Sequence, residues 1–568
     1  MNWNIFLILS VFVFSGCLEK SERRNQSFIE GKGIVTDSGM VVSAHPQGSL
    51  IGAKILRNGG NAIDAAVATE FALAVCYPEA GNIGGGGFML IRTKEGLYDV
   101  IDYREKAPML ASREMYLDKE GNVTEGLSTG THLASGVPGT VDGMIAAHSK
   151  YGKLPFKDVI QPAIDLAENG FPVTSEQAES LNANRTVFIE RNSGKPDFVK
   201  DSIWKEGDRL VQKALAVTLR RIRDNGRDGF YSGITARLIL KEMKRGQGII
   251  SERDLAEYRS VSRVPVSTDY RGYKIFTVPP PSGGGIILIQ LLEMTEPYPL
   301  AEWGFHSLPA VHLIVEAERR AFADRSEYLG DPAYMKIPVD QLISRKYMQK
   351  RMGTFNEYKA SYSTDIQPGS PGEYVSEETT HYCIVDSRGN AVSATTTLNG
   401  TFGSSIVVDS TGFLLNNQMD DFSVKPGFPN MYGLVGGETN SVQPGKRMLS
   451  SMTPVIVEKG GKLFLVAGSP GGSTIPTTVF QVVVNVIDFG MSIQDAVDAG
   501  RFHHQWQPDW ISLEKNAIDS ITAQKLRKMG HELKLRTSIG RVNAIQILPD
   551  GKKAAGTDKR GDNSSCGY

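Results

Sequence analysis

The chain has 568 residues, of which 40% are hydrophobic and 22% charged, and its formal net charge is −1. This composition is that of a globular protein long enough to bury a large core. Because neutralising phosphate groups requires a basic surface, the near-zero charge argues against nucleic acid as a main partner.

An apolar run of ten residues, from Ile5 to Phe14, lies near the N-terminus and is followed by Ser15, Gly16 and Cys17. Ten residues are too few to span a bilayer as a helix, but they suit the core of a signal peptide. Small residues followed directly by cysteine are similar to a bacterial lipobox. We therefore predict a signal peptide over residues 1–17 with lipid attachment at Cys17. A plain secretory signal cleaved elsewhere is the alternative.

Export follows from either interpretation, and we expect a periplasmic or cell-envelope protein that contacts the membrane only through its N-terminal lipid. Residues 18–33 are polar and predict a tether in front of the folded part. Beyond it, Cys76, Cys383 and Cys566 form no CxxC pair, so no zinc site is indicated. One disulfide bridge among these three thiols stays open, because the sequence does not say which two would pair.

Helical spacing of apolar residues predicts a mostly buried helical region over 49–75, interrupted at Gly59 and Gly60. A glycine-rich turn at 81–87 leads into expected strands at 88–91 and 98–103. For Gly84 to Gly87 we favour tight backbone packing over a phosphate cradle, because no Gly-Lys-Ser/Thr follows. The pattern is charged and helical over about 154–244, and a further helix is expected over 306–323.

The segment 352–376 is poor in large aliphatic residues and rich in Ser, Gly, Pro and Tyr, which is typical of exposed chain. Two strands are expected directly after it, at 380–385 and 391–398. A self-cleaving precursor needs such a segment, ending at a threonine that opens a buried hairpin. A linker between two ordinary domains is the alternative.

Thr379 stands at the junction of the exposed segment and the first of these strands. As a free N-terminus, its α-amino group, with an ordinary pKa of about 7.7–8.0, could accept the proton of its own hydroxyl. Before cleavage, the same hydroxyl could attack the carbonyl of Glu378 and form an ester that water opens. A Thr-Thr pair alone is usually only a β-branched strand start, so this interpretation depends on the surrounding motifs.

Several short motifs occur in a fixed order on both sides of Thr379. The upstream motifs are NIGGGGFM (82–89), DYREKAP (102–108), SGVPG (135–139) and PSGGG (281–285). The downstream motifs are TLNGTFG (397–403), LNNQMDDF (415–422), SSMTP (450–454), GSPGG (468–472) and RFHHQW (501–506). The ordered set resembles the γ-glutamyltransferases, also called glutathione hydrolases, from about residue 33 onward.

The resemblance implies an α/β N-terminal-nucleophile hydrolase fold, a four-layer αββα sandwich built by two chains from one self-cleaved precursor. The large subunit would span 34–378 and the small catalytic subunit 379–568, and the two would stay associated as a heterodimer. The reaction implied is hydrolysis of glutathione and other γ-glutamyl amides, or transfer of the γ-glutamyl group to amino acids and peptides through an ester on Thr379. No cofactor is implied. Glu378 stands where relatives vary, which leaves the rate of cleavage open.

The resemblance also implies catalytic roles for individual residues. Thr379 would be the nucleophile and Thr397 the neighbouring hydroxyl that supports it and aids self-cleavage. Backbone N–H groups of Gly471 and Gly472 would form an oxyanion hole. Removing one donor from such a hole typically lowers the rate by about 10²–10³.

Substrate binding would fall to a second set of residues. Arg104 would bind the α-carboxylate of the γ-glutamyl group, because guanidinium binds carboxylate bidentately, and Ser450 and Ser451 would donate further hydrogen bonds to it. Asp421 would bind the α-ammonium, with Asn399 and Gln418 as polar neighbours. Tyr432 would close a lid at 425–437, which favours small γ-glutamyl substrates over bulky acyl groups.

Three other functions remain as alternatives. The first is an acylase of the same architecture acting on other amides, and the second is a surface lipoprotein that binds a ligand without catalysis. The third is a serine hydrolase using Ser128 in the G-x-S-x-G match at 126–130, which lacks the hydrophobic strand that such an elbow needs. His503 and His504 are adjacent and the other histidines form no ligand spacing, so no metal site is predicted.

Overall fold

The computed structural model describes residues 28–368, 380–428, 430–431 and 437–568. The predicted signal peptide with Cys17, the predicted cut between Glu378 and Thr379, and the lid residue Tyr432 lie outside these ranges. Among the described residues, no helix combines the length and apolar character needed to cross a bilayer.

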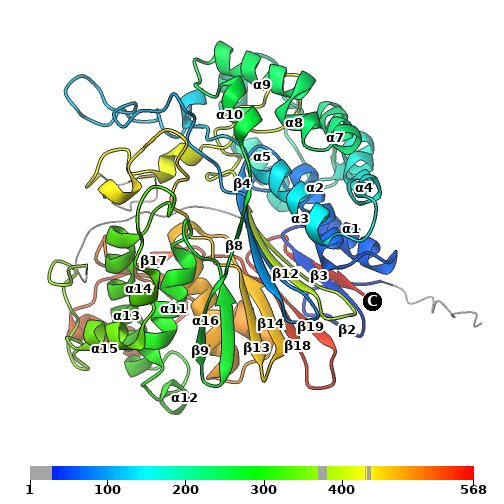
Figure 1. Cartoon of the computed structure of the whole chain (residues 1–568). Helices are drawn as coiled ribbons and strands as arrows, with labels where there is room; N and C mark the ends of the chain where they lie inside the picture. Colours follow the sequence, from blue (N-terminus) through cyan, green and yellow to red (C-terminus); the bar gives the residue numbers. More distant parts are fainter. Residues whose placement is uncertain (1–27, 369–379, 429, 432–436) are drawn as a thin grey trace, which may run out of the picture.

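Two large antiparallel β-sheets form the centre of the molecule (Figure 1). The eight-stranded sheet has the order β1 (Ile29–Gly31), β20 (Ser564–Gly567), β3 (Met40–Ser43), β11 (Thr380–Val385), β12 (Ala391–Thr397), β4 (Gly86–Arg92), β5 (Tyr98–Asp102) and β8 (Val261–Arg263). The seven-stranded sheet has the order β2 (Val35–Thr36), β19 (Lys553–Thr557), β18 (Asn543–Ile547), β14 (Lys462–Gly468), β13 (Val455–Lys459), β10 (Tyr273–Thr277) and β9 (Val266–Tyr270).

The two sheets are stacked face to face, with β11 and β12 against β14 and β18. Successive side chains of a strand point to opposite faces, and both faces are apolar here. In β4, Phe88 and Leu90 enter the core between the sheets, whereas Met89 and Ile91 face a helical layer. In β13, Ile456 faces the other sheet, whereas Val455 faces the second helical layer. Strands that are buried on both faces therefore read as continuous apolar runs.

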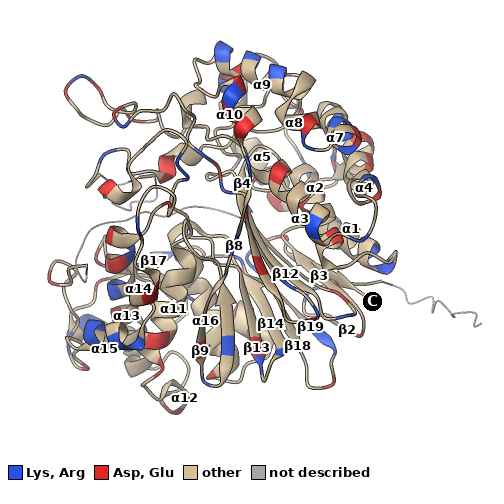
Figure 2. Cartoon of the chain, viewed as in Figure 1, with Lys and Arg blue, Asp and Glu red and all other residues tan. Residues whose placement is uncertain are grey.

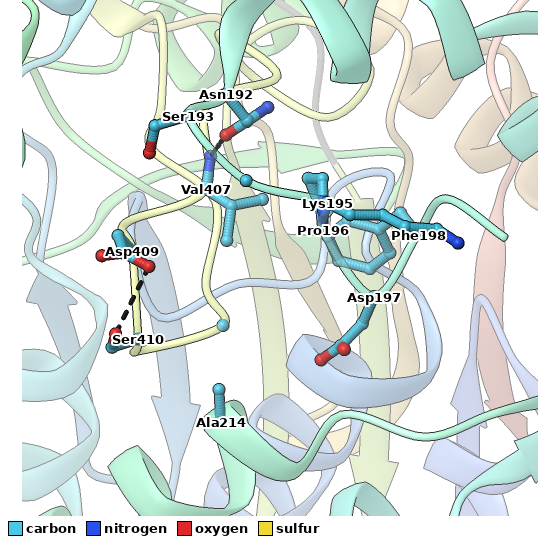
Figure 3. Close-up of a pocket in the computed structure, with 12 residues that line it drawn as sticks. Asn192, Ser193, Lys195, Pro196, Asp197, Phe198, Ala214, Val407, Asp409 and Ser410 are labelled. Carbon is cyan, nitrogen blue, oxygen red and sulfur yellow. Dashed lines mark hydrogen bonds between the residues drawn. The ribbon is translucent and has the colours of Figure 1, made fainter.

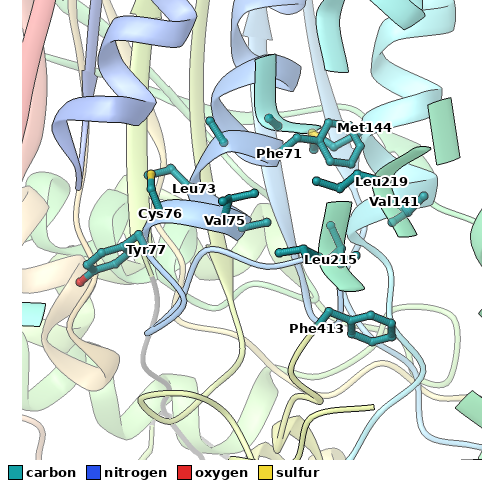
Figure 4. Packing of buried hydrophobic residues seen from close by; sticks show 14 of the residues in the cluster. Phe71, Leu73, Val75, Cys76, Tyr77, Val141, Met144, Leu215, Leu219 and Phe413 are labelled. Carbon is teal, nitrogen blue, oxygen red and sulfur yellow. The ribbon is translucent and has the colours of Figure 1, made fainter. Parts of the chain in front are cut away.

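One helical layer covers the outer face of the eight-stranded sheet. Its centre is α2, which is buried along its whole length, and Figure 4 shows Phe71, Leu73 and Val75 of this helix packed with Val141 and Leu215 of its neighbours. The helices of this layer are α1 (Pro46–Arg57), α2 (Ala62–Cys76), α3 (Thr140–Tyr151), α4 (Phe156–Asn169), α5 (Ser175–Ala183), α6 (Arg185–Arg191), α7 (Lys213–Asn225), α8 (Asp228–Tyr231), α9 (Gly233–Arg245) and α10 (Glu252–Glu257).

The second helical layer covers the seven-stranded sheet and shares an apolar core with it. It consists of α11 (Gly284–Thr295), α12 (Leu300–Trp303), α13 (Leu308–Tyr328), α14 (Val339–Leu342), α15 (Arg345–Met352), α16 (Ile475–Ile487), α17 (Ile493–Asp498) and α18 (Ser520–Met529). Small additional sheets are formed by β15 (Phe502–His503), β16 (Ile511–Glu514) and β17 (Leu533–Arg536), and by β6 (Phe171–Pro172) and β7 (Arg209–Leu210). Acidic and basic residues are mixed over the helices of both outer layers (Figure 2).

The predicted four-layer αββα sandwich is thus confirmed. Each central sheet mixes strands from both sides of position 379. In the eight-stranded sheet, β11 and β12 lie between β3 and β4, and β20 lies between β1 and β3. In the seven-stranded sheet, β13 and β14 are flanked by β10 on one side and lead through β18 and β19 to β2 on the other.

Local predictions were accurate where the pattern was strong. The helical region 49–75 is two helices, α1 and α2, separated at Gly59, whose φ of +96° suits glycine. The helix expected at 306–323 runs from Leu308 to Tyr328, beyond its predicted end. Cys76, Cys383 and Cys566 are all free and buried.

The tether predicted for residues 18–33 is wrong at its C-terminal end. Ile29–Gly31 is an edge strand, β1, paired with β20 from Ile29 opposite Gly567 to Gly31 opposite Ser565. Backbone hydrogen bonds hold an edge strand, and its side chains are largely exposed, so a polar composition does not exclude it. The folded part therefore begins before residue 34.

Candidate active site

The candidate site begins at the hairpin formed by β11 and β12. Thr380, the first described residue of β11, lies opposite Thr396 of β12, and Thr397 at the end of β12 lies opposite Gly86 of β4. Glu378 and Thr379 themselves lie outside the described residues, so the nucleophile and the point of cleavage stay predictions. Thr397 is fully buried one position beyond the last described pair of the hairpin.

The glycine run beside this hairpin packs backbone against backbone. A Cβ on Gly85 would lie 1.9 Å from the carbonyl oxygen of Thr397, and one on Gly87 would lie 2.2 Å from that of Thr395. Any larger residue would push β4 away from β12. The preference for tight packing over a phosphate cradle is therefore confirmed, and the motif fixes the position of Thr397.

Asn399 is fixed in the loop that follows β12. Its backbone N–H donates to Thr397 Oγ1 at 2.8 Å, its Nδ2 donates to the carbonyl oxygen of Asn417 at 3.0 Å, and its φ is +75°. Hydrogen bonds to Thr397 and Asn417 therefore hold a non-glycine residue in the left-handed region. Local strain of this kind clusters at functional sites.

Arg104 follows β5 and is completely buried. Its Nη2 lies 2.6 Å from Asp421 Oδ2, and its Nη1 lies 3.2 Å from Glu105 Oε2. It also donates to the carbonyl oxygens of Met448 and Leu449, at 3.3 and 3.2 Å. The structure therefore brings the predicted cation and anion of the pocket, 317 positions apart in sequence, into direct contact. Charges so far from water are tolerated only when paired and hydrogen-bonded.

Three buried acceptor atoms of the predicted substrate-binding residues lack a donor. Asn399 Oδ1, Gln418 Oε1 and Asp421 Oδ1 are buried, and none has a hydrogen-bond partner among the residues that the structure describes. Gln418 and Asp421 lie on the 3-10 helix η2 (Gln418–Asp421), where Gln418 Nε2 donates to Asp421 Oδ2. Burial raises the pKa of Asp421 well above its usual range, against the lowering effects of Arg104 and Gln418. A ligand ammonium would supply the missing donors, because buried acceptors are rarely left unsatisfied.

Ser450 and Ser451 lie directly after the two carbonyl groups that Arg104 binds. Ser450 Oγ accepts from the N–H of Met452 at 3.1 Å, and Ser451 Oγ accepts from Arg325 Nη2 at 2.8 Å. Both serines are fully buried. They therefore adjoin the Arg104 guanidinium, although each hydroxyl already has a protein partner.

Two residues of this cluster escaped prediction from the sequence. Asn440 links the segment of Asp421 to that of Leu449. Its Nδ2 donates to the carbonyl oxygen of Asp421 at 2.6 Å, and its Oδ1 accepts from the N–H of Leu449 at 3.0 Å. Arg325 reaches Ser451 from the last turns of α13, beyond the predicted end of that helix at 323. Because α13 also carries the buried arginines Arg319 and Arg320, no local signal distinguished Arg325.

Gly471 and Gly472 lead through the 3-10 helix η4 (Gly472–Thr474) into α16. Their φ angles are +134° and +63°, a region that favours glycine. A Cβ on Gly471 would meet Thr474 Oγ1 at 2.6 Å. Backbone N–H groups at a helix N-terminus can bind an anion, and the oxyanion-hole assignment of Gly471 and Gly472 stays a prediction.

The lid predicted at 425–437 is described only in part, and Tyr432 lies outside the described residues. Met431 belongs to the described part. Its Sδ lies 3.8 Å from Asn399 Nδ2, and its N–H donates to Asp420 Oδ2 at 3.3 Å. Met431, in the middle of the predicted lid segment, thus lies against Asn399 of the candidate site.

Ser128 does not have the surroundings of a serine nucleophile. Its hydroxyl donates to Asp420 Oδ1 at 2.6 Å, and no strand precedes it directly. The nearest histidine in sequence, His132, binds Glu242 at 2.8 Å instead. The G-x-S-x-G match is therefore no nucleophile elbow.

One group of potential metal ligands was missed. His312, Glu316 and His531 offer donor atoms within 4.8 Å of one another; the first two are four positions apart on α13, and the third is distant in sequence. The two rings are hydrogen-bonded to each other, His312 Nδ1 to His531 Nε2 at 2.8 Å, and Glu316 Oε2 accepts from Arg320 at 2.6 Å. The cluster is a hydrogen-bonded part of the core.

Buried titratable groups change the stability of the fold in both directions as the pH falls. Burial lowers the pKa of seven of them, to about 3 or 4 in six cases: His45, His306, His312, His381, His503, His504 and His531. Since the unfolded value is about 6.5, the unfolded state binds more protons between about pH 6.5 and 4, and stability is lost as the pH falls through this window. Six buried carboxyl groups with raised pKa values act in the opposite direction: Glu70, Glu79, Glu105, Glu318, Asp420 and Asp421.

A surface hollow of about 120 Å³ lies between residues 192–198 and 407–412 (Figure 3). Asn192 Oδ1 accepts there from the N–H of Val407 at 2.7 Å. None of the predicted site residues lines it, so we do not assign it to the reaction.

Comparison with known proteins agrees with this geometry. The gamma-glutamyltranspeptidase family model matches residues 48–568. Over 533 residues the chain is 48% identical to the glutathione hydrolase proenzyme of Escherichia coli strain K12, covering 93% of this chain and 92% of that protein. Among solved structures, the cephalosporin acylase from Bacillus halodurans superposes with a TM-score of 0.84 at 28% identity, covering 98% of this chain and 99% of the other. A chain of Helicobacter pylori gamma-glutamyltranspeptidase matches with a TM-score of 0.58 and 48% identity, covering 59% of this chain and 96% of its own length. The chain therefore belongs to the γ-glutamyltranspeptidase family.

Proposed function

We propose that the chain is a self-processing γ-glutamyltransferase that hydrolyses glutathione and other γ-glutamyl amides, or transfers the γ-glutamyl group to amino acids and peptides. One observation carries this proposal: a buried guanidinium, Arg104, lies beside acceptor atoms of Asp421 and Gln418 that lack a donor. A γ-glutamyl group ends in an α-carboxylate and an α-ammonium. The first matches a guanidinium, and the second supplies donors to the acceptors.

The reaction proceeds in two halves on Thr379. Its Oγ forms a bond to the γ-carbonyl carbon while its own α-amino group takes the hydroxyl proton. The bond from that carbon to the leaving nitrogen then breaks, and the same proton passes to the nitrogen. Water or an acceptor amine next attacks the ester, the bond to Oγ breaks, and a proton of the attacking group returns to Oγ. N–H groups of Gly471 and Gly472 stabilise the oxyanion that forms in each half.

Processing produces the nucleophile. Attack of the Thr379 hydroxyl on the carbonyl of Glu378 forms an ester, whose hydrolysis releases the α-amino group. The resulting chains, up to residue 378 and from 379 to 568, remain together as a heterodimer. The described strands from the two sides of the cut pair directly, β3 with β11 and β12 with β4.

The second candidate is an acylase that acts on other amides, and the similarity to a cephalosporin acylase favours it. A matched pair of substrates distinguishes the two functions: a γ-glutamyl anilide and the glutaryl anilide, which lacks only the α-ammonium. We expect the γ-glutamyl compound to be hydrolysed at least about 10²-fold faster, because a site built to pair a polar group discriminates strongly against its absence. Equal rates, or faster hydrolysis of the glutaryl compound, would favour the acylase.

We also propose that residues 1–17 direct export and that Cys17 carries the lipid, which holds the enzyme in the periplasm or cell envelope. The support is the apolar run followed by Ser15, Gly16 and Cys17. In a bacterial host, radioactive palmitate is expected to label the wild type and to leave Cys17→Ala unlabelled, with the variant recovered in the soluble fraction. Equal labelling of both proteins would contradict the assignment.

A further inference from the structure

Two buried asparagines, Asn82 and Asn416, contact the glycine run beside the hairpin, and the proposed reaction gives neither of them a role. They are 4% and 0% exposed. Asn82 Oδ1 accepts from the N–H of Gly85 at 2.8 Å, and Asn416 Nδ2 donates to the carbonyl oxygen of Gly84 at 2.8 Å. These two backbone groups belong to one peptide unit, which the two side chains therefore hold from both ends.

Asn82 connects this peptide unit to the end of β12. The pairing of β12 with β4 ends at Thr397 opposite Gly86, and the N–H of Gly85 donates to Asn82 instead of continuing the ladder. Asn82 Nδ2 supplies a donor in its place, since it lies 2.9 Å from the carbonyl oxygen of Thr397. Because buried backbone groups are rarely left without a partner, this hydrogen bond fixes the position of Thr397.

The backbone groups around the Asn82 amide determine its orientation. Its Oδ1 accepts from the N–H of Gly85 and, at 2.8 Å, from the hydroxyl of Thr140 at the start of α3. Its Nδ2 lies 2.9 Å from the carbonyl oxygens of both Thr397 and Ala80. A backbone N–H can only donate and a carbonyl oxygen can only accept, so exchanging the amide nitrogen and oxygen would lose these bonds. Asn82 thus joins the end of β12 to the start of α3.

Asn416 connects the same peptide unit to the residues assigned to the α-ammonium. Its Oδ1 accepts from the N–H of Gln418 at 3.0 Å and from that of Gly136 at 2.9 Å. Its Nδ2 donates to the carbonyl oxygen of Gly136 at 2.8 Å in addition to that of Gly84. Backbone groups therefore use both donors and both acceptor positions of this amide. Gln418 is the first residue of η2, which also carries Asp421, so Asn416 fixes the start of η2.

Resting on the proposed function, we propose that Asn82 and Asn416 are positioning residues with separate tasks, joined by the peptide unit that both hold. Asn82 holds Thr397, whose hydroxyl accepts from the N–H of Asn399, in the place from which it supports the predicted nucleophile. This task serves both self-cleavage and acyl transfer. Asn416 holds η2 in the place from which its side chains bind the α-ammonium, and this task serves substrate recognition alone.

The test compares two equal truncations, Asn82→Ala and Asn416→Ala, in three measurements. These are the rate constant of self-cleavage during cell-free synthesis of the full chain, kcat per cleaved chain for the γ-glutamyl anilide, and the ratio of kcat/KM for the γ-glutamyl and glutaryl anilides. We expect Asn82→Ala to lower the first two about tenfold and to keep the ratio, because a small misplacement of a reacting group slows the reaction strongly. We expect Asn416→Ala to keep the self-cleavage rate within about twofold and to lower the ratio about tenfold, because the acceptors of the ammonium are displaced.

Each truncation is the control of the other, because both remove the same side-chain atoms and a general loss of packing would change all three measurements in both variants. A milder pair of variants covers the case that a truncated chain does not fold. Thr140→Val removes the hydroxyl that donates to Asn82, and Ser135→Ala removes the hydroxyl that donates to the carbonyl oxygen of Asn416 at 2.8 Å. We expect these variants to show the respective effects at about threefold, as the loss of one neutral hydrogen bond predicts.

Two outcomes overturn the inference while leaving the proposed function intact. In one, both truncations change self-cleavage and the substrate ratio by the same factors; in the other, Asn82→Ala is cleaved at the wild-type rate or Asn416→Ala keeps the wild-type ratio. A surface truncation, Asn225→Ala, removes an exposed side chain that bonds to the carbonyl oxygen of Arg221, and it is expected to match the wild type throughout. A wild type without γ-glutamyl hydrolysis would contradict the proposed function instead, and the self-cleavage rates would still decide whether Asn82 positions Thr397.

Discussion

Replacement of Thr379 by alanine is expected to leave the chain in one piece and to lower γ-glutamyl hydrolysis by at least about 10⁴-fold, as removal of a nucleophile does in other acyl-transfer enzymes. The methyl group cannot attack the carbonyl of Glu378, so neither the α-amino base nor the nucleophile is produced. Denaturing electrophoresis and N-terminal sequencing measure the cut. In the wild type, the smaller chain is expected to begin with the sequence Thr379-Thr380-His381.

The neighbouring threonine offers a matched control. Thr380 is buried, and its hydroxyl has no hydrogen-bond partner among the described residues. Thr380→Val keeps the β-branched shape that suits β11, and we expect this variant to be cut and active. A wild type that stays uncut while hydrolysing γ-glutamyl substrates would overturn the mechanism on Thr379.

Asp421→Asn is expected to lower kcat/KM for a γ-glutamyl anilide about 10²-fold, with a much smaller effect on the glutaryl anilide. The side chain keeps its shape but loses its charge. A hydrogen bond to a charged group contributes about 1.5–3 kcal/mol, and only the γ-glutamyl substrate carries the ammonium that would make it. The measurement is the ratio of kcat/KM for the two anilides in variant and wild type.

Stability has to be measured in the same experiment, because Arg104 loses its partner at 2.6 Å and keeps Glu105 at 3.2 Å. A moderate fall in melting temperature is expected, as a buried charge becomes less well compensated. Asp409→Asn is the control, since Asp409 is 52% exposed and pairs with Lys241 at the surface. An equal loss for both anilides would show that Asp421 does not bind the ammonium.

The hairpin next to the predicted nucleophile could be predicted almost residue by residue. Strands were expected at 380–385 and 391–398, and they are found at Thr380–Val385 and Ala391–Thr397. Both are short runs of β-branched and apolar residues bounded by a polar turn, a pattern that local chemistry controls. The same reasoning failed for Ile29–Gly31, because the backbone of a partner at the far end of the sequence holds this strand.

The site could be predicted only through the ordered set of motifs. Nothing near Arg104 in the sequence indicates Asp421, and the contact between them is a property of the tertiary fold. Arg325 and Asn440 carry no such motif, and they act by holding Ser451 and the segment around Leu449. Long-range contacts of this kind are invisible to periodicity and spacing.

The alternation of strands from both sides of position 379 would make the proposed heterodimer a single folded unit. Pulling its two chains apart would break the pairing of β11 with β3 and of β12 with β4, and would split the core between the sheets. Separation of the subunits would then be the same event as unfolding, so the stability of the complex would depend on its concentration. Each half produced alone would expose unpaired strand edges, which are templates for aggregation. Synthesis as one chain, with the proposed cut made only after folding, would avoid this problem.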